Sequence, residues 1–317
     1  MANIIRRPGW YIPERFVTPE SVFRNRRAFL KELGFAGGAM LLASQLHAAD
    51  AAAPAVAAKK YPFPRNKEFD PAGVKLTDQQ VAGTYNNFYE FSTSKDRVHK
   101  LTEKFVIDPW PIEIGGLVEK PMKLDVKELV EMMPLEERIY RLRCVEAWSM
   151  TVPWTGFPMS KLIEKVQPKP EAKFVRFQTF YRPAQAPGFA DTNYPWPYTE
   201  GLRIDEAMNP LALFVTGIYG KPLPKQHGAP IRAVVPWKYG YKSIKSIVKI
   251  EFVAKQPSTL WETLMPNEYP FESNVNPEVP HPRWSQSTER VIDTNMRVRT
   301  KIYNGYGDYV ARLYPKA

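Results

Sequence analysis

The sequence predicts an α+β fold, because strand-like runs and short helices follow one another in no regular order, unlike the strict alternation of a doubly wound sheet. The 31 prolines indicate many turns and irregular connections. Since no GxGxxG, P-loop or GxSxG motif is present, nucleotide binding and serine-hydrolase chemistry lack support. A short helix is expected at 203–208, and strands are expected at 110–114, 174–180, 211–215, 231–235 and 244–253.

Local signals place several of these elements. Gly115-Gly116 predicts a turn after the first strand, with a return strand beginning at Leu117-Val118. Asp125 and Glu128 have capping-box spacing at the start of a helix that Pro134 ends. The aromatic and proline-rich stretch 181–198 predicts a long loop, which is either a surface excursion or a segment that shapes access to a site.

Composition and charge are those of an ordinary globular protein with a basic surface. At 317 residues the chain is long enough for one large domain or two fused lobes, and 44% of it is hydrophobic. The net charge of +11 is spread along the chain, and no nucleic-acid motif accompanies it. We therefore expect a solvated basic surface and no nucleic-acid partner.

The N-terminus resembles a twin-arginine export signal. Arg26 and Arg27 open RRAFLK, which is followed by an apolar stretch, 33–46, that is short for a membrane span. Small residues between 48 and 58 suit cleavage by a signal peptidase. We expect a signal peptide at 1–49, an extension at 50–76, a domain at 77–317, export by the twin-arginine machinery and a location in the periplasm; the alternative is an amphipathic helix with a chance arginine pair.

The chain has one cysteine, Cys144. A single cysteine excludes an internal disulfide, a c-type haem motif, a cysteine-ligated iron–sulfur cluster and a CxxC redox pair within the chain. The neighbouring Arg141 and Arg143 are expected to lower the pKa of the thiol and to favour a thiolate, which is a soft metal ligand. On these residues alone, a buried and inert cysteine remains the other reading.

The stretch 134–158, PLEERIYRLRCVEAWSMTVPWTGFP, resembles the cysteine loop of the sulfite-oxidase superfamily. Within that superfamily the chain is most similar to the catalytic subunits of periplasmic methionine-sulfoxide reductases. The resemblance extends from about residue 77 to the C-terminus, and further stretches match in order: YNNFYEF at 85–91, GLRIDEAM at 201–208, GAPIR at 228–232, PWKYGYK at 236–242 and HPRWSQ at 281–286.

The resemblance implies a mixed-sheet, molybdopterin-binding fold. It also implies one molybdenum per chain, held by the dithiolene of one molybdopterin and by the thiolate of Cys144. His227 stands where the family commonly has Asn, and Ser243 where it commonly has Gly. By the same resemblance the pterin pocket contains Asn86, Tyr89, Glu90, Thr179, His227, Arg232, Ser243, Ile244 and Lys245.

The activity implied is reduction of methionine sulfoxide in envelope proteins, with oxygen-atom transfer to the metal. Electrons would come from a haem-containing membrane subunit fed by quinone. Arg143 or Tyr239 is expected to orient the sulfoxide oxygen. Three alternatives remain open: a sulfite-oxidising molybdoenzyme, a metal-free envelope binding protein, and a thiol-based sulfoxide reductase, which the lack of a resolving cysteine disfavours.

Overall fold

The structure is a computed structural model that describes residues 60–71 and 73–314. The expected signal peptide and its cleavage region lie outside these residues. No helix within the described part of the chain has the length and apolar character needed to cross a membrane. Twelve strands are present in that part: β1 Pro111–Gly116, β2 Met122–Asp125, β3 Glu136–Cys144, β4 Trp148–Pro158, β5 Phe174–Thr179, β6 Thr199–Arg203, β7 Leu213–Ile218, β8 Lys221–Pro222, β9 Arg232–Val234, β10 Ile247–Val253, β11 Thr288–Val291 and β12 Arg297–Arg299.

Helices in the described residues are short. The α-helices are α2 Gln79–Thr84, α3 Val98–Leu101, α4 Val126–Glu131, α5 Met159–Val166, α6 Ile204–Ala207, α7 Leu260–Leu264 and α8 Gly307–Val310. Single turns of 3₁₀-helix connect them, namely η2 Lys67–Phe69, η3 Pro187–Ala190, η4 Lys225–His227, η5 Gly240–Lys242, η6 Ile302–Gly305 and η7 Ala311–Leu313.

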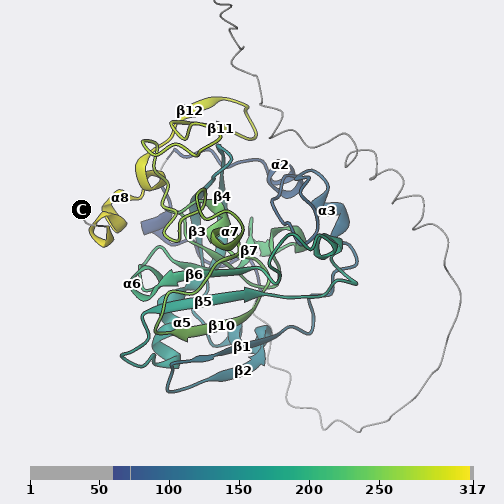
Figure 1. Ribbon diagram of the computed structural model, residues 1–317, viewed down its shortest axis with the longest axis vertical. Coiled ribbons are helices and arrows are strands. Elements are labelled where there is room, and N and C mark those ends of the chain that lie inside the picture. Colours follow the sequence, from purple (N-terminus) through teal and green to yellow (C-terminus); the bar gives the residue numbers. More distant parts are fainter. Residues whose placement is uncertain (1–59, 72, 315–317) are drawn as a thin grey trace, which may run out of the picture. The chain divides into compact units, whose positions relative to one another are not determined.

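The strands form two mixed sheets (Figure 1). One sheet has the order β2-β1-β10-β5-β6, in which β1 and β10 are parallel and the other pairs are antiparallel. The other has the order β12-β11-β4-β7-β8, with β3 beside β4 and β9 beside β7. Parallel and antiparallel pairs within one sheet, with helices in no regular alternation, confirm the predicted α+β class.

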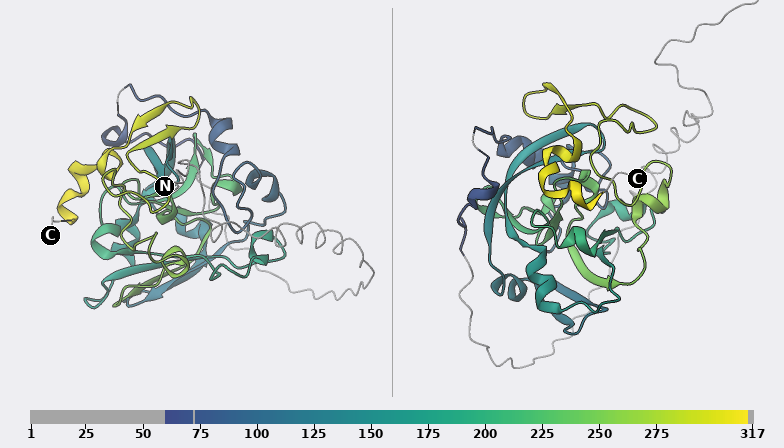
Figure 2. Two further views of the ribbon diagram at one scale, coloured as in Figure 1. Left: turned by 45° about the horizontal axis from the view of Figure 1, so that its top comes forward. Right: turned by 90° about the vertical axis from the view of Figure 1, so that its left-hand side faces the viewer.

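The long hairpin of β3 and β4 is the element that presents Cys144. The two strands pair antiparallel from Glu136↔Gly156 to Cys144↔Trp148, so the cysteine ends β3 at the turn. On its other side β4 pairs with β7 and, in parallel, with β11 from the C-terminal segment. Figure 2 shows the yellow C-terminal strands beside the hairpin. Sequence-distant segments therefore converge on the turn.

The expected helix after the first strands is confirmed. Asp125 caps α4 with a complete capping box in which Glu128 is the partner. The expected return strand at Leu117-Val118 is wrong, because the backbone there bonds elsewhere: Leu117 N donates to Phe252 O, and Val118 bridges Pro168. The return strand β2 begins only at Met122.

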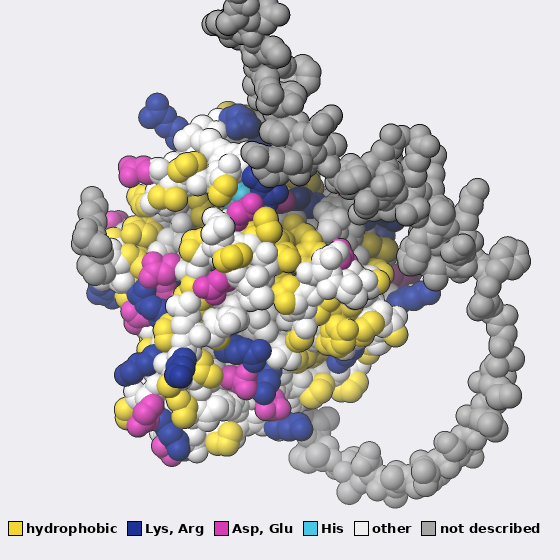
Figure 3. Space-filling model, viewed as in Figure 1, with side chains coloured by type: hydrophobic (Ala, Val, Ile, Leu, Met, Phe, Trp, Pro, Cys, Tyr) yellow, Lys and Arg dark blue, Asp and Glu magenta, His cyan; other side chains and the backbone are white. Residues whose placement is uncertain are grey.

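Charged side chains on the face shown in Figure 3 are interspersed, with Lys and Arg among Asp and Glu. Beneath the surface, large aromatic side chains form much of the core. Phe105 and Phe180 have ring centroids 4.5 Å apart, and Trp110 packs on both rings. This cluster lies under the loop Tyr85–Glu90 through Phe88, which contacts Phe180. The core thus supports one wall of the pocket described next.

Candidate active site

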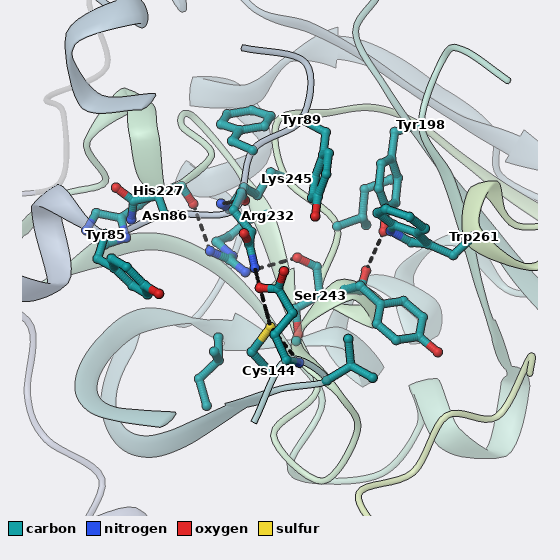
Figure 4. A pocket seen from close by; sticks show the side chains of 18 of the residues that line it. Tyr85, Asn86, Tyr89, Cys144, Tyr198, His227, Arg232, Ser243, Lys245 and Trp261 are labelled. Carbon is teal, nitrogen blue, oxygen red and sulfur yellow. Dashed lines mark hydrogen bonds between the residues drawn. The ribbon is translucent and has the colours of Figure 1, made fainter. Parts of the chain in front are cut away.

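One pocket collects residues from several distant segments of the chain (Figure 4). The loop after α2 supplies Tyr85–Glu90, and the β3–β4 turn supplies Cys144 with its neighbours. Two segments around β9 supply the polar wall: His227, Arg232, Ser243, Ile244 and Lys245. An aromatic wall completes it, formed by Tyr89, Tyr198, Tyr241, Trp261 and Tyr269.

Cys144 lies at a tight turn that directs its sulfur into the pocket. Because Cys144 pairs with Trp148, only three residues close the hairpin, and Ala147 adopts a positive φ of 58°. The residue is 5% exposed. Its Sγ is 3.3 Å from Asn87 Nδ2, 3.5 Å from Glu146 N and 3.6 Å from Glu146 Oε2.

The expected lowering of the thiol pKa by Arg141 and Arg143 is wrong. Burial and the negative charge of Glu146 raise the pKa of Cys144 to about 12. The charge of Arg143 acts in the expected direction, but burial and Glu146 outweigh it, and both guanidinium groups bind the carboxylate of Glu289. In this arrangement a thiolate forms when a bound cation replaces the proton.

Arg232 is buried and Lys245 is half-buried, and neither cation has a carboxylate within ion-pair distance among the described residues. Arg232 donates to three backbone carbonyls, those of His227, Ala233 and Ser243. Lys245 Nζ donates to the carbonyl of Asn87. Burial lowers the pKa of Arg232 to about 9 and that of Lys245 well below its usual range. Two positive side chains that are largely withdrawn from solvent and line one pocket favour an anionic ligand.

The neutral polar groups of the pocket are only partly used by the protein. Asn86 Nδ2 donates to Ala82 O at 3.1 Å, but its buried Oδ1 has no hydrogen-bond partner. Burial lowers the pKa of His227 to about 3, so the imidazole is neutral. Ser243 Oγ accepts from Val235 N at 3.1 Å. The serine hydroxyl is thus committed to the fold, whereas Asn86 and His227 are available to a ligand.

Tyr89, which lies in the upper part of Figure 4, and Glu90 also line the pocket. The ring of Tyr89 packs edge-on against Trp261 with centroids 5.1 Å apart. Burial raises the pKa of Glu90 to about 7 and raises that of Tyr89 as well. The Tyr89 hydroxyl is therefore neutral at physiological pH, and the Glu90 carboxyl is neutral over part of the physiological pH range.

The structure does not place three of the expected residues in the pocket. Thr179 Oγ1 donates to the carbonyls of Lys245 and Ser246, so it supports the wall from behind. Arg143 is buried in bonds to Glu289 and Gln286 and does not reach the cavity. Tyr239 lines a neighbouring pocket, where its hydroxyl is 3.4 Å from Asn276 O. Arg143 is thus committed to the fold, and Tyr239 lies in an adjoining pocket that shares Val145 and Tyr241 with the first.

The sequence did not predict Asn87 and Glu146, which contact the sulfur, or Lys95, which pairs with Glu146, as site residues. Asn87 donates to both Cys144 Sγ and Glu146 Oε2, and Lys95 Nζ is 2.9 Å from Glu146 Oε2. For Asn87 and Glu146 the sequence did contain a signal, namely closeness to other site residues: Asn87 follows Asn86, and Glu146 lies two residues after the cysteine in a turn. For Lys95 the sequence contained no such signal, because its contact with Glu146 depends on the tertiary fold.

These groups fit the phosphorylated pterin and soft metal that the resemblance implies. Arg232 and Lys245 suit a phosphate, the unpartnered Asn86 oxygen suits a ring N–H donor, and the cysteine sulfur suits the metal. No part of this fit depends on Arg143, Thr179 or Tyr239.

Comparisons with known proteins agree with this reading. Residues 99–261 match the model of the oxidoreductase molybdopterin binding domain. The chain is 49% identical over 308 residues to the protein-methionine-sulfoxide reductase catalytic subunit MsrP of Burkholderia mallei, covering 96% of this chain and 93% of that one. It is 48% identical over 309 residues to the MsrP of Xanthomonas axonopodis pv. citri, covering 96% and 95%.

Among solved structures, the sulfane dehydrogenase SoxCD from Paracoccus pantotrophus aligns with a TM-score of 0.47 and 17% identity, over 74% of this chain and 65% of that one. The close relatives and the domain match, on a mixed-sheet α+β fold whose pocket contains Cys144, show that the chain belongs to the molybdopterin-dependent MsrP family of oxidoreductases.

Proposed function

We propose that this chain reduces methionine sulfoxide in proteins, with one molybdenum-pterin cofactor in the pocket and Cys144 as the protein ligand of the metal. The observation that carries the proposal is the position of the cysteine. The chain's one sulfhydryl lines the same cavity as Arg232 and Lys245, two cations without an ion pair among the described residues. The names of the relatives supply the substrate.

The residues of the chain have separate tasks in this proposal. Arg232 and Lys245 would hold the phosphate, the former as a fork and the latter as a point charge. Asn86 and His227 would satisfy the polar edges of the pterin. Bound in this way, the cofactor would supply two-electron oxygen-atom transfer.

The aromatic wall suits the substrate that the proposal names. Within this wall Trp261 packs edge-on against Tyr89, with ring centroids 5.1 Å apart, and tilted against Tyr269, with centroids 4.9 Å apart. Aromatic rings are favourable neighbours for the sulfur and methyl group of a methionine side chain. The wall would exclude water and receive the side chain while the sulfoxide faces the metal.

The site also needs a source of electrons and a compartment. Because the chain has one cysteine and no second redox motif, we propose a haem-containing membrane subunit, fed by quinone, as the electron donor. The twin-arginine-like segment at 26–31 supports export of the folded protein to the periplasm, where oxidised envelope proteins would be the substrates.

The experiment is a comparison of wild type with Cys144→Ser and with Met150→Leu, a volume-conserving change in the same pocket. Metal content is measured by elemental analysis, and turnover is measured with oxidised protein and with sulfite. We expect molybdenum and sulfoxide reduction in wild type and Met150→Leu, and neither in Cys144→Ser. Turnover of sulfite but not of sulfoxide would reverse the proposed direction, and full activity of metal-free protein would overturn the proposal.

A further inference from the structure

The peptide groups on both sides of Cys144 are held by one distant segment, Trp284–Glu289. Val145 O, the first carbonyl after the cysteine, accepts hydrogen bonds from Trp284 Nε1 and Gln286 Nε2, each at 2.8 Å. A backbone carbonyl has two lone pairs, so these two donors fill its capacity. The orientation of the Val145–Glu146 peptide is therefore fixed from outside the turn.

The two donors are themselves held in place. The indole ring of Trp284 stacks on His281 with centroids 3.8 Å apart and rings within 8° of parallel. Arg283 covers the ring at 5.0 Å. Gln286 is 1% exposed, and its Oε1 accepts from Arg143 Nη2 at 2.7 Å, which leaves its amide nitrogen facing Val145. Neither side chain has freedom to turn away.

The residue before the cysteine is held by the same segment. Arg143 is fully buried, its Nε donates to Glu289 Oε2 at 2.7 Å, and its Nη1 donates to Cys144 O. Thr300 Oγ1 donates to the same carboxylate oxygen at 2.9 Å. The carbonyl of Cys144 is thus tied to Glu289 through the Arg143 side chain, as that of Val145 is tied to Trp284 and Gln286.

This arrangement restricts the backbone on either side of the cysteine, and with it the direction of the Cys144 Cα–Cβ bond. The segment that does so lies beyond residues 99–261, which match the molybdopterin-binding domain. The restraint is therefore contributed by the C-terminal part of the chain and not by the matched domain itself.

We propose that Trp284 and Gln286 are positioning residues for the metal-binding thiolate: they hold the turn so that the sulfur meets the metal from a single direction. This rests on the proposed role of Cys144 as the metal ligand. A sulfur free to adopt several directions would give the metal several electronic environments, because the ligand's orientation and its supporting contacts tune the metal.

The test uses the full-length, metal-loaded protein. Trp284→Phe keeps the stacked ring and removes the N–H, and Gln286→Met keeps length and removes the donor. Ser285→Ala is the control, since Ser285 lies between them and bonds to Ser287. Four quantities are measured: molybdenum content, the electron paramagnetic resonance spectrum of the half-reduced metal, kcat and KM for oxidised protein, and amide hydrogen exchange at Glu146 and Ala147 in cofactor-free protein.

We expect each single variant to keep its metal, to broaden or split the resonance spectrum, to exchange the turn amides at least about five-fold faster and to lower kcat about five-fold with KM unchanged. Ser285→Ala should match wild type. Unchanged spectra and exchange in both variants would overturn the inference. If instead wild type shows no cysteine-bound molybdenum, it is the proposed function that fails, so the two failures are distinguishable.

Discussion

The half-buried Lys245 and the buried Arg232 are two cations that line one pocket, and each lacks an ion pair among the described residues. The positive charge of Arg232 adds to burial in lowering the pKa of Lys245. An arrangement of this kind costs stability unless an anion is bound. These two charges should therefore lower the stability of the cofactor-free protein and raise that of the cofactor-loaded protein.

We therefore predict that the effect of Lys245→Met on stability has opposite signs in the cofactor-free and cofactor-loaded forms. In cofactor-free protein the variant should be more stable than wild type by at least about 1 kcal/mol, because a half-buried charge without an ion pair is removed. In loaded protein it should be less stable and should lose cofactor. Urea unfolding of both forms checks this, with the exposed Lys255→Met as the control. A variant that destabilises both forms equally would show that Lys245 is only a packing residue.

His227 predicts a dependence of cofactor-free stability on pH. Burial, and then the charges of Lys245 and Arg232, lower the pKa of His227 to about 3 from 6.5. Between pH 6.5 and about 3, the unfolded chain therefore binds a proton at His227 that the folded chain does not bind. The free energy of unfolding decreases as pH falls through this range, and the decrease attributable to His227 is roughly 2 kcal/mol at pH 5.

The comparison with His227→Asn isolates that effect. Glu90, whose pKa is raised to about 7 by burial, titrates in the opposite sense between pH 4.5 and 7, so the difference between the two proteins is the observable. Chemical unfolding at pH 5 and pH 8 should show that the stability of His227→Asn relative to wild type is higher at pH 5 than at pH 8. If the stability difference were the same at both pH values, the imidazole would be protonated in the folded state at pH 5.

Local sequence signals predicted local structure well. The capping box of Asp125 and Glu128 involves residues three apart, so its geometry follows from the helix alone. Eight of the nine expected pterin-pocket residues line one cavity; the exception is Thr179. Asn86, Tyr89, Glu90 and Arg232 lie within the matched stretches, and the other four directly adjoin them.

The interactions that sequence could not predict are long-range. Arg143 was expected to lower the pKa of the neighbouring thiol, but burial of the thiol outweighs its charge, and its side chain is bound to Glu289, 146 positions away. The return strand was placed too early because the bonds of Leu117 go to Phe252, which no local pattern shows. In both cases tertiary pairing decides what a local charge or turn does.

Asp125 predicts a two-part loss of stability. Its Oδ1 caps α4 through Lys127 N at 2.8 Å, and its Oδ2 accepts from Trp110 N at 2.7 Å. Asp125→Ala should lose both bonds, at a cost of about 2 kcal/mol or more. Asp125→Ser keeps a capping oxygen and loses the Trp110 bond, so it should fall between Asp125→Ala and wild type in urea unfolding. Equal losses in both variants would assign all of the energy to the bond with Trp110.

Gly188 connects the long loop 181–198 to the pocket. Its N–H donates to Glu90 O at 2.7 Å, and a Cβ at this position would lie 2.0 Å from Tyr89 O. Both neighbours are backbone that carries pocket side chains, so a methyl group cannot be accommodated by a rotamer change.

Gly188→Ala should therefore displace either the loop or the Tyr89–Glu90 backbone. We expect a loss of about 1–3 kcal/mol in stability and a weaker hold on the cofactor, seen as faster release of molybdenum on dilution. Gly115→Ala is the matched control, because nothing lies within 4 Å of a Cβ there. If Gly188→Ala lost stability but kept its cofactor as firmly as wild type, the loop would have moved alone and the pocket backbone would be set by the core beneath Phe88.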